Sequence, residues 1–314
     1  MALPKCFKTL GIVPATALLL SVYGLTHLSL HLLLKATVTC GRLSFRDVVA
    51  GSLGDAGVLS MQLVVIVNNL GGLVVFLIII GDVLSGQGDR AGLLTPLGAP
   101  WSLRPVAVAF TVALVHTPLC LLRRMDSLKF TSALSMCLTF LFITITLSLV
   151  GDRIYARRIG TINWWPDQNA SPGDVLKTLP VMLTAYVCHY NIHPIFSEMA
   201  NPTEPRMRRV VTTALVTCTA IYWLVGAAAY VLFTDRTADD VLMNFGRDLD
   251  MHRGEAWVER AVKLGYAISL SCTFPLIQIS LRQNIFDLAG WGPAPEKPYL
   301  FVGVTVRSLQ MRCS

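Results

Sequence analysis

Charged side chains are scarce in this sequence. Asp, Glu, Lys and Arg make up only 14% of its 314 residues, whereas soluble domains carry about 25%. Hydrophobic residues make up 54% of the chain. With so few charges the chain cannot cover a water-facing surface, so its composition excludes an ordinary soluble protein.

Motifs for metal binding and covalent catalysis are also missing. The eight cysteines form no Cys-x-x-Cys or Cys/His pattern with metal-ligand spacing. The sequence also has no nucleophile–base constellation and no phosphate-binding loop. Its net charge of +7 is spread over loops and not gathered in a basic patch, so nucleic acid is not an expected partner. We therefore expect neither an enzyme nor a resident cofactor.

What the sequence does contain is a series of long uncharged runs. About 20 apolar residues, at 1.5 Å of helical rise each, cross a hydrocarbon core roughly 30 Å thick. Backbone groups in lipid must be satisfied within the segment, so each such run predicts a transmembrane helix. Seven runs are long enough: Thr9–Leu34, Ala56–Gly81, Pro105–Leu122, Phe130–Gly151, Thr178–Ser197, Val210–Thr234 and Leu264–Leu281. The sequence therefore predicts an all-α, multi-pass membrane protein in contact with lipid.

The connections between these runs predict its orientation. Short connections at 35–55, 123–129 and 198–209 are rich in Lys and Arg, which places them on the cytoplasmic side. Longer connections at 83–104, 152–177 and 235–263 would face outward, and the last of these is acidic. The sequon Asn169-Ala170-Ser171 falls on this outer side, where glycosylation can occur.

Polar residues inside the apolar runs are the candidate functional residues, because polar groups at membrane depth often mark a substrate or ion path. The first cluster is Asn68 and Asn69, which Gly71 and Gly72 follow. Two adjacent amides point in different directions around a helix, so one can line a path. The alternative is that they join helices by hydrogen bonds.

A second cluster lies at 186–193, with Cys188, His189 and Asn191 before Pro194. Proline cannot donate to the helix ladder and biases the residue before it away from helix. An interrupted helix would free backbone groups at depth, which transporters use to hold substrates and ions. The alternative is that the cluster meets headgroups at the cytoplasmic end.

A third cluster carries hydroxyls. Ser269 and Thr273 are four residues apart and so share one helix face, with Ser271 between them and Pro275 after them. Such oxygens suit a hard cation such as Na⁺. The alternative is that the hydroxyls bond back to their own helix.

Four stretches together resemble a known family: "NNLGGLVVFLIIIGDVLSG", "TPLCLLRRMDSLKFTSALS", "YVCHYNIHPIFSEMANPTEPRMRRVV" and "FPLIQISLRQNIFDL". They are similar to the amino acid/auxin permease superfamily, and most of all to its sodium-coupled neutral amino acid transporters and the vacuolar relatives in plants and fungi. The resemblance implies the LeuT-like inverted-repeat fold, with a substrate site at the midplane beside a broken first and a broken sixth helix.

The resemblance also implies which residues act. Asn68 and Asn69 match the family's third helix, and Cys188 and His189 match the sixth, near the substrate path. Thr273 matches the eighth at a position associated with the cation, with Ser269 and Ser271 as neighbours. We predict that Asn191 joins the substrate-binding set.

The resemblance further implies an incomplete fold. Residues 1–10 match the outer half of the family's first helix, and the family continues past Asp287 through three more spans. We therefore expect seven full spans plus an N-terminal half-helix, with a partial transporter domain at 1–288 and a divergent tail at 289–314.

The function expected from these observations is secondary active transport. A neutral amino acid would move with Na⁺ or H⁺ across a plasma, vacuolar or lysosomal membrane. An amino-acid sensor that binds without transport, and a truncated fragment without function, are the alternatives.

Overall fold

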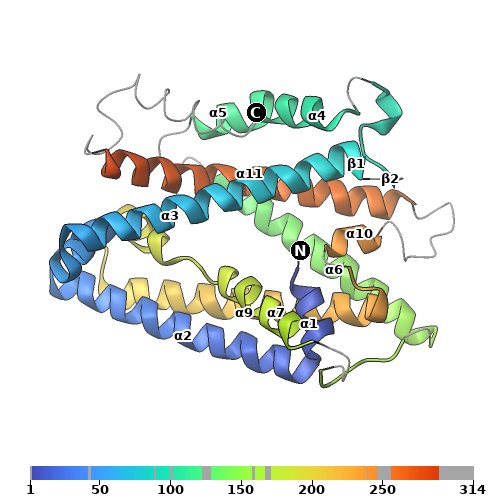
Figure 1. Ribbon diagram of the computed structural model, residues 1–314, viewed down its shortest axis with the longest axis horizontal. Coiled ribbons are helices and arrows are strands. Elements are labelled where there is room, and N and C mark those ends of the chain that lie inside the picture. The colour runs from blue at the N-terminus through green and yellow to red at the C-terminus, as the bar shows by residue number, and fades with distance from the viewer. Residues whose placement is uncertain are drawn as a thin grey trace. The chain divides into compact units, whose positions relative to one another are not determined.

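The computed structural model describes residues 2–41, 44–87, 90–99, 102–121, 129–157, 160–166, 171–238, 240–245 and 256–289. Helices dominate this part of the chain (Figure 1). The strands in it are β1 (Gly86–Gln87) and β2 (Arg90–Ala91), which pair antiparallel. A ladder this short only closes a turn between helices, so the expected all-α class is confirmed.

The chain divides into two compact units. Unit 1 comprises Met1–Ser44 and Phe140–Glu259, and unit 2 comprises Phe45–Thr139 and Arg260–Ser314. The elements of unit 1 are α1 (Leu3–Leu10), α2 (Ile12–Thr39), α7 (Pro172–Thr184), η4 (His189–Asn191), α8 (Ile192–Glu198), α9 (Glu204–Phe233), η5 (Thr234–Arg236) and α10 (Val241–Phe245). Those of unit 2, besides the strands, are α3 (Phe45–Ser85), η1 (Thr95–Leu97), α4 (Arg104–Thr111), η2 (Val112–His116) and α5 (Thr117–Cys120). Helix α6 (Lys129–Tyr155) continues from unit 2 into unit 1, and nearly all of α11 (Ala256–Leu288) belongs to unit 2.

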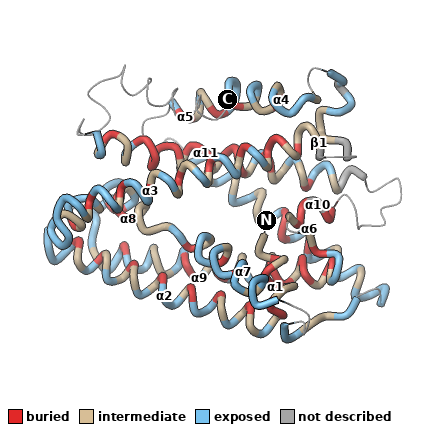
Figure 2. Tube along the Cα trace, in the orientation of Figure 1, coloured by how far each residue is buried: buried red, intermediate tan, exposed pale blue. Residues whose placement is uncertain are grey.

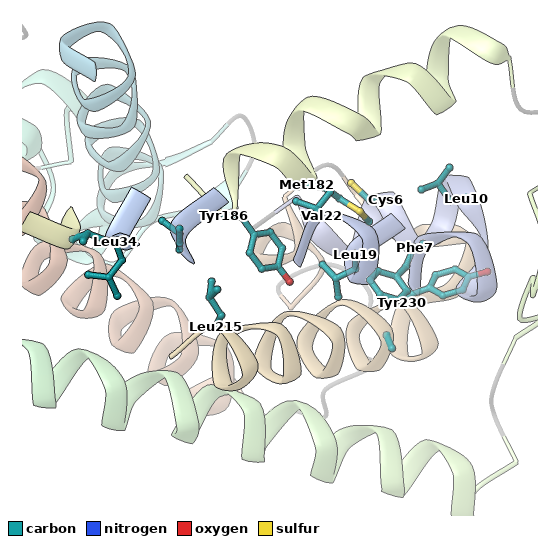
Figure 3. Close-up of a cluster of buried hydrophobic side chains, with 14 of the residues drawn as sticks. Cys6, Phe7, Leu10, Leu19, Val22, Leu34, Met182, Tyr186, Leu215 and Tyr230 are labelled. Atoms are coloured by element: carbon teal, nitrogen blue, oxygen red, sulfur yellow. The ribbon is translucent and has the colours of Figure 1, made fainter. Parts of the chain in front are cut away.

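The core of unit 1 forms where α1, α2 and α7 pack against one another and α9 (Figure 3). Phe7 of α1 and Tyr230 of α9 are both fully buried in this cluster. Gly226 of α9 makes room for the aromatic ring, because a Cβ at this position would lie 2.5 Å from Cε2 of Phe7. Helix α1 is thus packed into the unit through a close approach that glycine permits.

A second glycine shapes the junction between α1 and α2. Gly11 has φ +78°, a conformation that glycine adopts without strain. A Cβ here would lie 2.6 Å from the carbonyl carbon of Trp165. The close approach lets the amides of Ile12 and Val13 donate to the carbonyls of Asn163 (3.2 Å) and Trp164 (3.1 Å). Two backbone donors that the start of α2 would leave unsatisfied are therefore paired.

In unit 2, α3 and α11 share a buried cluster with η2 and α5. Its fully buried members include Leu73 of α3, Cys120 of α5 and Phe274 of α11. Helix α3 bends at Gly54, which has the non-helical angles φ 65° and ψ −167°. The bend leaves one uninterrupted segment after Gly54 that contains the predicted run at 56–81.

In the part of the chain that the structure describes, five helices are long and apolar enough to cross a membrane: α2, α3, α6, α9 with η5 (Glu204–Arg236), and α11 from Glu259 to Leu288. Exposed positions recur along these helices (Figure 2). Many of them are occupied by large apolar residues, such as Leu25 at 65%, Val64 at 68% and Phe130 at 77% exposure. So many exposed apolar residues suit helices that face lipid and not water. The membrane-spanning character predicted from composition is therefore confirmed in these helices.

The two other predicted runs lie on interrupted helices. Arg104–Cys120 is a shorter apolar helix that contains the π-helical turn η2. Pro118 has no N–H to donate to the ladder. At the residue before it, the amide and the hydroxyl of Thr117 both donate to the carbonyl of Val112, the hydroxyl at 2.8 Å. The run at 178–197 is divided between α7 and the η4–α8 segment, which we describe below.

Several predictions fall outside the described residues. Two of them are the glycosylation of Asn169 in its sequon and the cytoplasmic placement of Arg123 and Arg124. The other two concern residues 246–255 of the acidic connection at 235–263 and the tail from residue 290 onward. The sequon's Ser171 is described, and it caps α7 by accepting a hydrogen bond from the amide of Gly173 at 3.2 Å.

Candidate functional site

The helix of the fifth predicted run is broken at 185–188. Helix α7 ends at Thr184, the next four residues are non-helical, and η4 begins at His189. The sequence placed this interruption at Pro194, but Pro194 lies in the first turn of α8. A missing N–H costs little in a first turn, where amides have no intrahelical acceptor. The break therefore precedes the proline.

Tight turns replace the helix ladder across the break. The amide of Tyr186 donates to the carbonyl of Leu183 at 3.1 Å, and that of Asn191 donates to the carbonyl of Cys188 at 3.0 Å. Cys188 has φ −136° and ψ 4°, well outside helical geometry. The predicted residues Cys188, His189 and Asn191 therefore lie together on this irregular segment, where each is half-buried.

Helix α9 holds the break from one side. The hydroxyl of Tyr222 donates to the carbonyl of Ala185 at 3.0 Å. The hydroxyl of Thr219 donates to its own helix at Leu215, so Tyr186 donates to Thr219 across 2.8 Å. The Tyr186 and Tyr222 rings also meet edge to face at a centroid distance of 5.5 Å. These contacts fix the backbone at the end of α7.

Helix α2 holds the other part of the segment through hydroxyl–imidazole pairs. Nε2 of His189 lies 2.6 Å from Oγ of Ser29, and Nε2 of His193 lies 2.9 Å from Oγ1 of Thr37. Hydrogen bonds of hydroxyl and imidazole side chains therefore tie the broken segment to α2 and to α9.

In unit 2, the two predicted asparagines have different surroundings. Asn69 is 1% exposed, and its Nδ2 donates to Oγ of Ser280 on α11 at 3.3 Å. Its Oδ1 is buried and has no hydrogen-bond partner among the described residues. Asn68, one position along α3, is half-buried. Asn69 thus links α3 to α11 by a hydrogen bond, as the alternative interpretation of the asparagines predicted. Its Oδ1 remains available as an acceptor.

The predicted hydroxyl cluster lies between α6 and α11 within unit 2. Oγ of Ser135 on α6 lies 2.8 Å from Oγ of Ser269 and 3.1 Å from Oγ1 of Thr273. Thr273 also donates to the carbonyl of Ser269 at 2.9 Å, which is the back-bonding expected as the alternative. Ser271 lies about 200° around the helix from Ser269 and is not among these contacts. The structure therefore brings together two of the three predicted cation ligands.

Sequence reasoning missed several residues that shape these sites. Ser29 stands between His27 and His31 in the first apolar run, so the rule that flagged other polar residues at membrane depth could have found it. Ser135 has no such histidine neighbours in the sequence that would have marked it in the same way. Arg282 is only 2% exposed, and its Nη1 donates to the carbonyl of Cys120 at 2.9 Å, where it satisfies the C-terminal end of α5.

Within the described residues, no group of three or more His, Cys, Asp or Glu side chains is placed to hold a metal ion. On the exposed face of α7, the Lys177 ammonium donates to the Asp174 carboxylate at 2.8 Å and holds the pKa of that carboxyl below its ordinary value. This charged pair lies before the predicted run at 178–197.

Comparison with known proteins gives one family. The family described as "Transmembrane amino acid transporter protein" matches residues 1–305. Amino acid transporter AVT6B of Arabidopsis thaliana is 34% identical over 296 residues, which cover 92% of this chain and 64% of the relative. Amino acid transporter AVT6E of the same plant is 34% identical over 314 residues, covering 98% and 64%. Solute carrier family 38 member 10 of Homo sapiens is 26% identical over 294 residues, covering 92% and 25%.

The chain thus spans a little under two thirds of the length of these plant relatives. No solved structure matches the chain.

Proposed function

Because the chain belongs to the transmembrane amino acid transporter family, we propose that it is a secondary active transporter of neutral amino acids, driven by a Na⁺ or H⁺ gradient. The observation that carries this proposal is the broken helix at 185–188, which α2 and α9 hold in place. Irregular backbone at membrane depth is tolerated where it lines a cavity or lies within protein, and transporters use it to hold substrates.

The proposed fold is the LeuT-like inverted repeat, with seven full spans that follow α1. In it, the interrupted helices at 104–120 and 178–197 also cross the membrane, which brings the five long helices to seven. The membrane is a plasma, vacuolar or lysosomal membrane. The function requires no covalent chemistry.

An amino acid zwitterion needs acceptors for its ammonium group and donors for its carboxylate. In unit 1 we assign Cys188, His189 and Asn191 at the break to this recognition, and in unit 2 the predicted substrate residues are Asn68 and Asn69. The unpartnered Oδ1 of Asn69 supports its assignment, because a buried acceptor without a partner costs free energy that a ligand donor would offset.

The coupling cation, if it is Na⁺, would be held by the hydroxyl cluster. Ser269 and Thr273 supply hard oxygen atoms, and Ser135 adds a third within hydrogen-bond distance of both. Ser271 was predicted as a further ligand. Because it lies about 200° around the helix from Ser269, it would have to approach the cation from another direction.

Uptake into proteoliposomes tests the proposal. Purified full chain would be reconstituted and offered labelled L-alanine or L-glutamine under an inward Na⁺ gradient, an inward H⁺ gradient, or neither. We expect accumulation with one gradient and its loss when an ionophore dissipates that gradient. Binding without uptake would identify a sensor, and absence of both would refute the transporter assignment for this chain.

Ser135→Ala tests the cation site in the same assay. If Na⁺ is the coupling ion, losing one ligand should raise the half-saturating Na⁺ concentration by roughly fivefold, the factor for about one hydrogen-bond equivalent. Thr139→Val is the matched control, because Thr139 lies one turn further along α6 and donates only to the carbonyl of Ser135. Equal effects of the two variants would exclude a specific role for the Ser135 hydroxyl.

A further inference from the structure

The hydroxyl of Ser29 has a single proton, and a carbonyl of its own helix lies within hydrogen-bond distance of that hydroxyl. Ser29 donates to the carbonyl of Thr26 on its own helix at 3.0 Å. Hydroxyls along α2 follow this pattern, since each donates to a carbonyl about one turn earlier: Thr16 to Ile12, Ser21 to Ala17 and Thr37 to Leu33. Oγ of Ser29 therefore faces His189 as an acceptor.

This arrangement fixes the proton on the His189 ring. Nε2 of His189 lies 2.6 Å from Oγ of Ser29, and an acceptor oxygen at this distance requires an N–H on Nε2. In a neutral imidazole the other nitrogen, Nδ1, then carries the lone pair and can only accept. Nδ1 of His189 has no hydrogen-bond partner among the described residues.

A second histidine, His193 in helix α8, provides the contrast. Nε2 of His193 meets Thr37 in the same way, at 2.9 Å, and Thr37 also donates its proton to its own helix. His193, however, is only 4% exposed and enclosed in the core, whereas His189 is half-buried at the break. The two pairs have the same chemistry, but the His189 pair alone stands on the irregular segment.

We propose that Ser29 is a positioning residue for substrate recognition, which holds His189 with its proton on Nε2 so that Nδ1 accepts a hydrogen bond from the ammonium group of the amino acid. This inference rests on the proposed function. It adds Ser29 of α2 to the residues predicted for substrate recognition. It also assigns Nδ1 of His189 to the ammonium group of the substrate.

Nitrogen NMR of the full chain, labelled with ¹⁵N-histidine in lipid nanodiscs, tests the positioning without any transport. His189→Gln and His193→Gln spectra assign the signals. We expect a neutral His189 ring protonated on Nε2, a tautomer mixture in Ser29→Ala, and the original form in Ser29→Thr, which keeps the oxygen. A ring protonated on Nδ1, or on both nitrogens, in the unsubstituted chain would overturn the inference.

Addition of L-alanine tests the substrate contact. We expect the His189 Nδ1 signal to shift while the His193 signals stay in place, and propionate, which lacks the ammonium group, to leave both unchanged. The Kd for L-alanine should rise roughly fivefold in Ser29→Ala, the factor for one neutral hydrogen bond, and recover in Ser29→Thr. Thr37→Val, which removes the equivalent contact to His193, should leave the Kd unchanged.

The outcomes separate the two proposals. If L-alanine binds without a shift at Nδ1, or if Thr37→Val weakens binding as much as Ser29→Ala, this inference fails and the transporter assignment stands. If the unsubstituted chain neither binds nor transports, the proposed function fails and the substrate contact fails with it. The tautomer measurement would still decide whether Ser29 positions His189.

Discussion

Replacing Gly226 by alanine should destabilise the protein, because the new methyl group would collide with Phe7. The two residues meet where α1 packs against α9, and a Cβ at Gly226 would lie 2.5 Å from Cε2 and 2.7 Å from Cδ2 of the ring. Carbon atoms in contact prefer about 3.5–4.0 Å. The ring would have to move by roughly 1 Å, and it is fully buried, so its neighbours would have to move as well.

The size of the effect follows from two opposing contributions. Overpacking a core by one methyl group typically costs about 1–3 kcal/mol. Alanine in place of glycine in a helix interior gains up to about 1 kcal/mol. We expect Gly226→Ala to lower the free energy of unfolding by roughly 1–2 kcal/mol in total.

Gly24→Ala is the matched control. Gly24 lies inside α2 of the same unit, is exposed, and has no atom within 4 Å of the position a Cβ would take. It should show only the gain in helix propensity. The difference between the two variants then isolates the collision, at roughly 1–3 kcal/mol.

Unfolding of the detergent-solubilised chain, followed by circular dichroism as dodecyl sulfate is added, measures both variants. The double variant Gly226→Ala with Phe7→Leu removes the ring that collides. Its free energy of unfolding should therefore exceed the value expected from adding the two single effects by about 0.5–3 kcal/mol. The packing reasoning would be refuted if Gly226→Ala were as stable as Gly24→Ala, or if the double variant were simply additive.

Three further outcomes follow from the same geometry. Gly11→Ala should cost roughly 1 kcal/mol more than Gly41→Ala in the same unfolding assay, since both have positive φ but only Gly11 would collide with backbone; equal costs would contradict this. A double-mutant cycle of Asn69→Ala and Ser280→Ala should give a coupling near 0.6 kcal/mol, the mean for hydrogen bonds between membrane helices, and zero coupling would rule out the bond. Amides at 185–191 should exchange with deuterium faster than those of α9, and equal protection would argue against a weakly held break.

The sequence was enough to predict the secondary structure and its membrane character. Most of the described residues in each of the seven apolar runs are helical, because a backbone in lipid must satisfy its own hydrogen-bonding groups. The fifth run is interrupted at 185–188. The sequence placed this break too late, at Pro194. Proline marks where a ladder hydrogen bond is missing, but the first turn of α8 needs no such bond, so the irregular residues come earlier.

Contacts between distant residues could not be predicted in the same way. Helical spacing put Ser269 and Thr273 on one face, and the structure confirms that both reach the same oxygen. That oxygen belongs to Ser135, 134 residues from Ser269, and Ser29 is 160 residues from His189. Periodicity describes one helix at a time, so it cannot show which hydroxyl of another helix completes a pair.

The contacts at the break are weak enough for the segment to rearrange. Tyr222 to Ala185, Tyr186 to Thr219, and His189 to Ser29 are hydrogen bonds between uncharged groups. Bonds of this kind between membrane helices contribute about 0.6 kcal/mol each, so releasing three costs roughly 2 kcal/mol. A second conformation that lies about 2 kcal/mol higher is populated at a few per cent, within the range that a ligand can shift. Buried ion pairs in the same places would leave uncompensated charges when they separate, at about 3–5 kcal/mol each, and would hold the segment in one state.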